Sequence, residues 1–191
     1  MLVLGLPRGG VAVAYEVARA LGAPLDVFVV RKLEEPGSDA PLGLIAAGGV
    51  RILDAPAISA RRVPRSKIDE VARREALELS RLERYYRDGR QPPKMTGREV
   101  ILVDDGLTAP AMLQSAADAL LAYRPARAIV AIPAADGARC AELASRLGDV
   151  VCALPLHGPT NSSDLYERDD EPSDRDVRHF LSQRQDHRLA G

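Results

Sequence analysis

Five short apolar runs, separated by helical patterns, constrain the fold of this chain more than any other feature of its sequence. They are Leu2 to Leu6, Leu25 to Val30, Val100 to Val103, Ala128 to Ile132 and Val150 to Leu154. Runs without polar alternation are typical of parallel strands that helices cover on both faces. Between the runs, apolar residues recur at helical spacing, and two of these patterns end at Gly22 and Gly148. This order predicts an α/β fold with a doubly wound parallel sheet.

Residues 34–95 interrupt the alternation of strands and helices. Two apolar runs between Leu42 and Ile52 flank a Gly-Gly pair, which predicts a β-hairpin. Ser66 and Asp69 resemble a capping pair, and the helical spacing after them predicts a long helix that stops near Gly89. We expect the hairpin and this helix to form a small hood over the sheet.

Length and charge limit the organisation and the partners of the chain. With 191 residues, 46% of them hydrophobic, it can bury one good core. We expect a single domain over residues 1–191, ending in a polar tail from about 167 to 191 with one helix, Asp174 to Leu181. Net charge is -1, acidic and basic residues are interleaved, and aromatic residues make up only 4%, so nucleic acid is not an expected partner.

Several features favour a cytoplasmic location. Cys140 and Cys152 lie in apolar segments, which predicts buried free thiols and favours a reducing compartment. Met1 to Leu6 lacks a basic flank and Arg8 interrupts it early, so we expect no export signal. No run reaches the roughly 18 apolar residues of a membrane-spanning helix, so we expect no membrane partner. The sequence leaves the oligomeric state open, with a homodimer as one alternative. It also leaves open whether the chain is truncated before the first strand.

The first candidate site is Pro7-Arg8-Gly9-Gly10, here called the glycine loop, which follows the first apolar run and opens a helix. Glycines allow close approach of the backbone, and the helix N-terminus presents free N–H groups. Arg8 adds charge-assisted donors. These features suit a diphosphate, and an ordinary turn with a solvated arginine is the alternative.

The second candidate site is Asp104 and Asp105, here called the acid pair, at the end of the central apolar run. Carboxylates there can accept hydrogen bonds from two ribose hydroxyls or help to hold Mg²⁺. The alternatives are a turn that caps the next helix and the acidic strand end of a receiver domain. Ligands bind beyond the carboxyl ends of parallel strands, so we expect the glycine loop and the acid pair to share one crevice, with Arg31 and Lys32 facing it.

Three stretches occur together in the order Pro-Arg-Gly-Gly-Val, Val-Val-Arg-Lys-Leu and Val-Ile-Leu-Val-Asp-Asp-Gly-Leu. In this order they resemble a bacterial branch of the type I phosphoribosyltransferases, and the resemblance extends as far as Leu165-Tyr166-Glu167. It implies the phosphoribosyltransferase type of sheet and hood and binding of phosphoribosyl diphosphate (PRPP) with Mg²⁺. It also implies transfer of ribose 5-phosphate to a nitrogenous base, whose identity no motif specifies.

The resemblance also implies residue roles. The diphosphate would lie on Pro7, Arg8, Gly9 and Gly10 with support from Arg31 and Lys32, and the ribose hydroxyls on Asp104 and Asp105. The 5-phosphate would lie along Gly106, Leu107, Thr108, Ala109 and Ala111. Arg8 and the acid pair would be the catalytic residues. The protein would supply no complete metal site: PRPP would carry Mg²⁺, helped by Asp104 or Asp105 through water.

The 5-phosphate loop departs from the family pattern, which continues with Thr-Gly-x-Thr. Here the segment is Thr108-Ala109-Pro110-Ala111-Met112, which lacks the glycine, one N–H donor and a hydroxyl. Each lost hydrogen bond to a phosphate costs about 1.5–3 kcal/mol, so losing two weakens binding roughly a hundredfold or more.

Three hypotheses follow from these motifs. The first is a PRPP-dependent transferase with impaired activity, and the second is a non-catalytic module of the same fold that binds a sugar phosphate or nucleotide. The third is a receiver-like signalling domain, which the glycine loop and the hairpin disfavour. The altered 5-phosphate loop favours the second hypothesis over the first.

Overall fold

The main sheet confirms the predicted α/β class. The computed structural model describes residues 1–38, 40–147, 149–156, 166 and 171–189. Five parallel strands lie in the order β2-β1-β6-β7-β8. They are β1 (Leu2–Gly5), β2 (Leu25–Val27), β6 (Glu99–Val103), β7 (Arg127–Asp136) and β8 (Val150–Leu156). The chain winds outward from β1 to β2 on one side and from β6 to β8 on the other. The topological switch point, where ligands bind in such sheets, therefore lies between β1 and β6.

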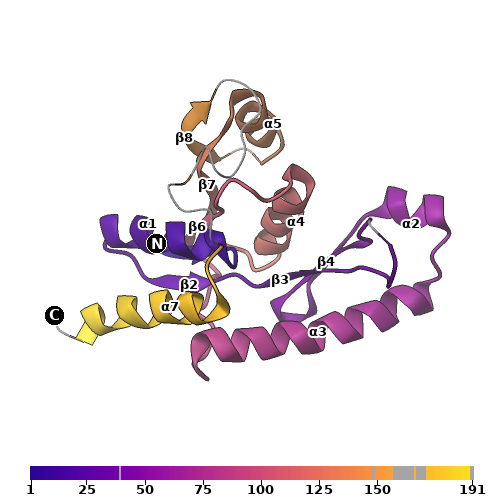
Figure 1. Ribbon diagram of the computed structural model, residues 1–191, viewed down its shortest axis with the longest axis horizontal. Coiled ribbons are helices and arrows are strands. Elements are labelled where there is room, and N and C mark those ends of the chain that lie inside the picture. Colours follow the sequence, from indigo (N-terminus) through magenta and orange to yellow (C-terminus); the bar gives the residue numbers. More distant parts are fainter. Residues whose placement is uncertain (39, 148, 157–165, 167–170, 190–191) are drawn as a thin grey trace.

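Helices cover both faces of this sheet (Figure 1). The helices on one face are α1 (Gly9–Ala20), α3 (Arg65–Arg87) and α7 (Asp174–Leu189), and those on the other are α4 (Pro110–Leu121) and α5 (Gly137–Leu147). Successive strand residues alternate between the two layers: Val3 packs in the α1 layer and Leu4 in the α4 layer. Because both layers are apolar, the strands show the continuous hydrophobic runs that predicted them.

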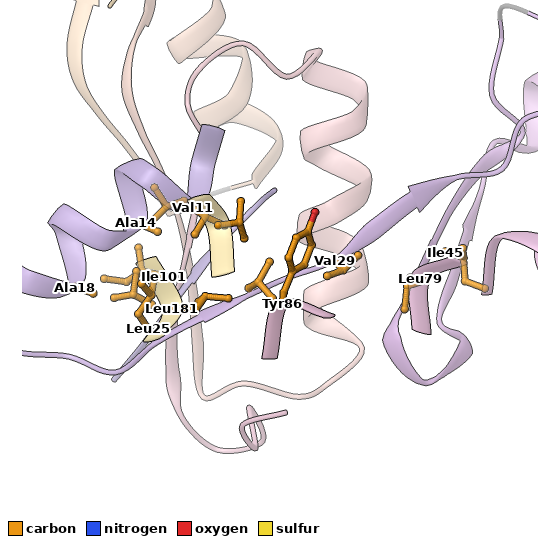
Figure 2. Packing of buried hydrophobic residues seen from close by; sticks show 14 of the residues in the cluster. Val11, Ala14, Ala18, Leu25, Val29, Ile45, Leu79, Tyr86, Ile101 and Leu181 are labelled. Carbon is orange, nitrogen blue, oxygen red and sulfur yellow. The ribbon is translucent and has the colours of Figure 1, made fainter. Parts of the chain in front are cut away.

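The C-terminal helix is part of the core. We expected a helix over 174–181 in a polar tail, but α7 runs on to Leu189 and buries Val177 and Leu181. Figure 2 shows Leu181 beside Leu25 and Ile101, with Ala14 and Ala18 of α1 close by. Residues 167–170, 190 and 191 of the expected tail lie outside the described residues.

A second, three-stranded antiparallel sheet forms where the hairpin was predicted. It consists of β3 (Val30–Lys32), β4 (Gly43–Ala46) and β5 (Arg51–Leu53), with the 3-10 turn η1 (Ala47–Gly49) between β4 and β5. The short helix α2 (Ala55–Arg61) follows, and α3 packs against this sheet. The predicted C-terminal boundary of the strand at 25–30 was wrong, because Val30 pairs with Ala46 in this second sheet.

The predicted capping pair of the long helix was also wrong. Helix α3 begins after Pro64 without a side-chain cap, and the Asp69 carboxylate instead accepts a 2.6 Å hydrogen bond from Arg51 Nη1. Proline fixes the backbone at the helix entry, so the helix starts there without a side-chain acceptor.

A buried ion cluster joins the end of α3 to the main sheet. The Arg87 side chain is only 5% exposed. It donates to Asp26 at 2.9 Å, to Glu83 at 2.6 Å and to the carbonyl oxygen of Val27 at 2.9 Å. The burial of Asp26 raises the pKa of its carboxyl, and the nearby Arg87 guanidinium opposes that rise.

The prediction of free thiols was wrong. Cys140 on α5 and Cys152 on β8 are joined in a disulfide, with their Cα atoms 6.0 Å apart. Helix α5 packs directly on β8, which brings the two sulfurs together. The cysteines therefore give no support for a reducing compartment. None of the described helices combines the length and the apolar composition needed to cross a lipid bilayer.

Candidate functional site

The glycine loop and the acid pair meet at the switch point between β1 and β6. The backbone N–H of Leu6 donates to the carbonyl oxygen of Val103 at 2.9 Å, which fixes the two strand ends side by side. A Cβ atom built on Gly9 would lie 1.9 Å from Oδ2 of Asp105. The two loops are thus in direct contact, and the predicted common crevice is confirmed.

A cavity of about 560 Å³ opens between the two loops, within the roughly 300–1,000 Å³ typical of ligand pockets. We call it the aspartate cavity. It is lined by Leu6, Pro7, Arg8, Gly9, Gly10, Ala12, Val13, Asp104, Asp105, Leu107, Thr108, Tyr166, Glu171 and Pro172. Every residue of the glycine loop and both acids belong to its wall, as a shared sugar–phosphate site requires.

The two acids differ in their surroundings. Asp104 is almost fully buried, and its carboxylate accepts hydrogen bonds from Gly106 N at 2.9 Å and from the Thr108 hydroxyl at 2.5 Å. Asp105 is half-buried, and its Oδ1 accepts from Leu107 N at 2.9 Å. Asp104 therefore shapes its own loop, while Oδ2 of Asp105 is directed at the glycine loop.

Burial raises the pKa of the Asp105 carboxyl, and the negative charges of Asp104 and Glu171 raise it further, against the hydrogen bond from Leu107. A raised carboxyl pKa adds stability that is fully present below the ordinary value of 3.8 and is lost as the pH rises through the folded-state pKa. The charged form of Asp105 is thus disfavoured by the fold at neutral pH.

Asp105→Asn is therefore expected to stabilise the protein at neutral pH by roughly 0.5–1 kcal/mol, allowing for partial exposure, because the amide oxygen still accepts from Leu107. Urea unfolding at neutral pH and below pH 3.8 measures the gain, which should vanish at the lower pH. The exposed Asp88→Asn serves as control. An equal gain at both pH values would contradict the electrostatic explanation.

Arg31 and Lys32 are not among the residues that line the aspartate cavity. They line an adjoining cavity of about 710 Å³, which shares Leu6, Pro7, Leu107 and Thr108 with the first. The Arg31 guanidinium donates to Oε2 of the buried Glu75 at 2.8 Å. The reason is that both cations belong to β3 of the second sheet and not to the end of β2.

The predicted 5-phosphate loop divides among three environments. Leu107 and Thr108 line both cavities, and Ala109 lines only the adjoining one, together with Met112. Gly106 and Ala111 are not among the residues lining these two cavities in the described part of the chain. Gly106 has a φ of 86° and passes so close to β7 that an added Cβ would meet the Ala134 oxygen at 2.4 Å, so its role in the fold is structural.

Two polar side chains of the aspartate cavity were not predicted as site residues. The Tyr166 hydroxyl donates to the carbonyl oxygen of Asp105 at 2.5 Å, and Glu171 forms an ion pair with Arg8. Burial, together with Asp105 and Asp104, raises the pKa of Tyr166. The resemblance included the segment Leu165-Tyr166-Glu167 but implied no role for Tyr166, and Glu171 lies beyond that segment.

The donor set at the acid pair fits a metal ion carried by a ligand better than a protein-bound ion. Within the described residues, no three histidine, cysteine or carboxylate groups come together as a metal site. Both carboxylates already accept hydrogen bonds from their own loop. Oxygen atoms of a bound phosphate would have to supply most ligands of Mg²⁺.

Comparisons with known proteins identify the family of the chain. Residues 1–152 match the family described as phosphoribosyl transferase domain, and the chain belongs to this family. A Mycobacterium tuberculosis protein named "Putative phosphoribosyl transferase", known from strains CDC 1551 and H37Rv, is 38% identical over 153 residues. The match covers 80% of this chain and 34% of that protein, so the chain spans about a third of the length of these curated relatives.

A solved structure shows the same fold. The crystal structure of TT1426 from Thermus thermophilus superposes with a TM-score of 0.79 and 36% sequence identity. The superposition covers 94% of this chain and 86% of that one. The predicted phosphoribosyltransferase type of doubly wound sheet is therefore confirmed.

Proposed function

We propose that this protein binds PRPP with Mg²⁺ in the aspartate cavity and transfers ribose 5-phosphate to a nitrogenous base. One observation carries the proposal: Asp105 directly faces Gly9, so that an acid able to hold ribose hydroxyls lies against a loop suited to a diphosphate. In PRPP the diphosphate is attached to C1 of the ribose, next to the hydroxyl-bearing carbons C2 and C3. The family membership of the chain supports the same reaction class.

The transfer breaks the bond between C1 of the ribose and the diphosphate oxygen and forms a bond from C1 to a nitrogen of the base, which loses a proton. Arg8 and the amides of the glycine loop would stabilise the negative charge that develops on the leaving diphosphate. The carboxylates of Asp104 and Asp105 would orient the ribose and favour the cationic, oxocarbenium-like ring. Mg²⁺, bound mainly through PRPP oxygens, would add charge neutralisation at the leaving group.

A second candidate is a non-catalytic module that binds a sugar phosphate or nucleotide. The observation that favours it is the wall near the start of α4, where Leu107, Ala109 and Met112 line the adjoining cavity. Proline at the first position of α4 has no N–H to offer a phosphate. Weakened binding of the 5-phosphate would lower turnover and leave diphosphate and ribose recognition intact.

Calorimetric titration with PRPP and Mg²⁺ tests the site. The variant Asp104→Asn plus Asp105→Asn is expected to bind about a hundredfold more weakly, because charge-assisted hydrogen bonds to the ribose are lost. Asp88 does not line the cavity, so Asp88→Asn should bind like the unmodified protein. No heat from the unmodified protein would contradict the proposal.

Release of diphosphate from PRPP in the presence of a panel of purine and pyrimidine bases then separates the two candidates. Base-dependent release identifies a transferase and its acceptor. Binding without release for every base would favour the non-catalytic module.

A further inference from the structure

The cation of the glycine loop already has an anionic partner from within the chain. Nη2 of Arg8 contacts Oε2 of Glu171, 163 residues further along the sequence. Both side chains line the aspartate cavity and are partly exposed, 42% for Arg8 and 57% for Glu171. The Glu171 carboxylate is therefore paired with the Arg8 guanidinium group that a diphosphate would bind.

The helix that follows Glu171 is anchored by contacts that do not involve Arg8. Ser173 and Asp176 form a reciprocal cap at the start of α7. The Tyr86 hydroxyl of α3 donates to Asp174 at 2.7 Å. Val177 is fully buried on the next turn. Packing of α7 thus holds the chain just after Glu171, whose side chain lines the aspartate cavity.

The other charged groups of the cavity increase the effect of the Glu171 carboxylate on an anionic ligand. Among the described lining residues of the aspartate cavity, Arg8 is the only cation, whereas Asp104, Asp105 and Glu171 supply three carboxylates. Glu171 also acts electrostatically on Asp105, so it lies near enough to repel another anion at the same place. An incoming diphosphate must displace Glu171 from Arg8 and then tolerate its charge.

We propose that Glu171 is a tethered competitor that holds Arg8 in the ligand-free protein and must leave it when a diphosphate group binds. The inference rests on the proposed function, since it assigns the diphosphate to the glycine loop. The inference adds a carboxylate of the chain itself that lowers the affinity of the glycine loop for diphosphate.

The test is calorimetric titration of the full chain with inorganic diphosphate in the presence of Mg²⁺. Glu171→Gln is expected to bind about fivefold more tightly than the unmodified protein, because an exposed ion pair no longer has to be broken and a repulsive charge is gone. Glu171 is exposed, so the variant should fold normally.

Asp88→Asn is the matched control. It removes an ion pair of similar exposure, 43% for Arg178 and 67% for Asp88, which also ties α7 to the end of α3. Unchanged affinity in this control separates the carboxylate from a general loosening of α7. Asparagine also tolerates the left-handed backbone found at position 88.

The outcomes distinguish the inference from the proposed function. Equal or weaker binding by Glu171→Gln, with clear binding by the unmodified protein, would overturn the competitor role and leave the diphosphate loop standing. Equal tightening in Asp88→Asn would overturn it as well. Absence of diphosphate binding in all three proteins would overturn the assignment of the glycine loop, and the inference with it.

Discussion

Replacing Gly10 with alanine is expected to destabilise the protein by about 3 kcal/mol and to abolish PRPP binding. A Cβ atom there would lie 2.7 Å from the carbonyl oxygen of Val103 and 3.1 Å from the Cα atom of Asp104. Both are backbone atoms, so no side-chain rotation relieves the overlap. The glycine loop or the acid pair must move, and the common cavity is lost. Denaturant unfolding and calorimetric titration measure the two effects.

The control for Gly10 is Gly137→Ala at the start of α5. Its added Cβ would meet the Leu156 oxygen at an ordinary 3.5 Å, so no loss of stability is expected. If Gly10→Ala were as stable as Gly137→Ala, the close approach of the two loops would be contradicted.

Arg87→Met is expected to cost about 3–5 kcal/mol of folding free energy, because it leaves two partly or fully buried carboxylates without their cation. Those carboxylates belong to Asp26 and Glu83, and the Val27 carbonyl oxygen also loses a donor. Urea unfolding at neutral pH measures the loss. Methionine has a similar length and keeps the apolar packing, so the change reports mainly on charge.

The exposed pair of Arg127 with Asp149 provides the comparison, and Arg127→Met should change stability little. The loss in Arg87→Met should shrink as the pH falls toward the ordinary aspartate value, because the raised pKa of Asp26 lets its carboxyl become neutral first. A loss that stayed constant over this range would show that packing, and not the buried charge, is responsible.

The fold class and the principal site were predictable because their signals are local. Continuous apolar runs mark strands covered on both faces, and the chain order of strands and helices then requires a parallel sheet. The glycine loop and the acid pair each follow such a run directly, so placing the strands also placed both loops at one edge of the sheet.

Long-range partners were not predictable in the same way. Arg31 was expected at the diphosphate because it follows an apolar run, but β3 turns into a second sheet and pairs it with Glu75, 44 residues away. Cys140 and Cys152 were expected to be free, since an apolar neighbourhood does not reveal which elements pack together.

The sequence by itself determined the doubly wound sheet and the meeting of the glycine loop with the acid pair, because periodicity and motif position depend on neighbouring residues. Only the tertiary structure decided that Glu171 contacts Arg8 and that Tyr166 contacts Asp105. Those contacts depend on how α7 and the segment before it pack against the finished sheet. Packing joins residues far apart in sequence, and no local pattern encodes it.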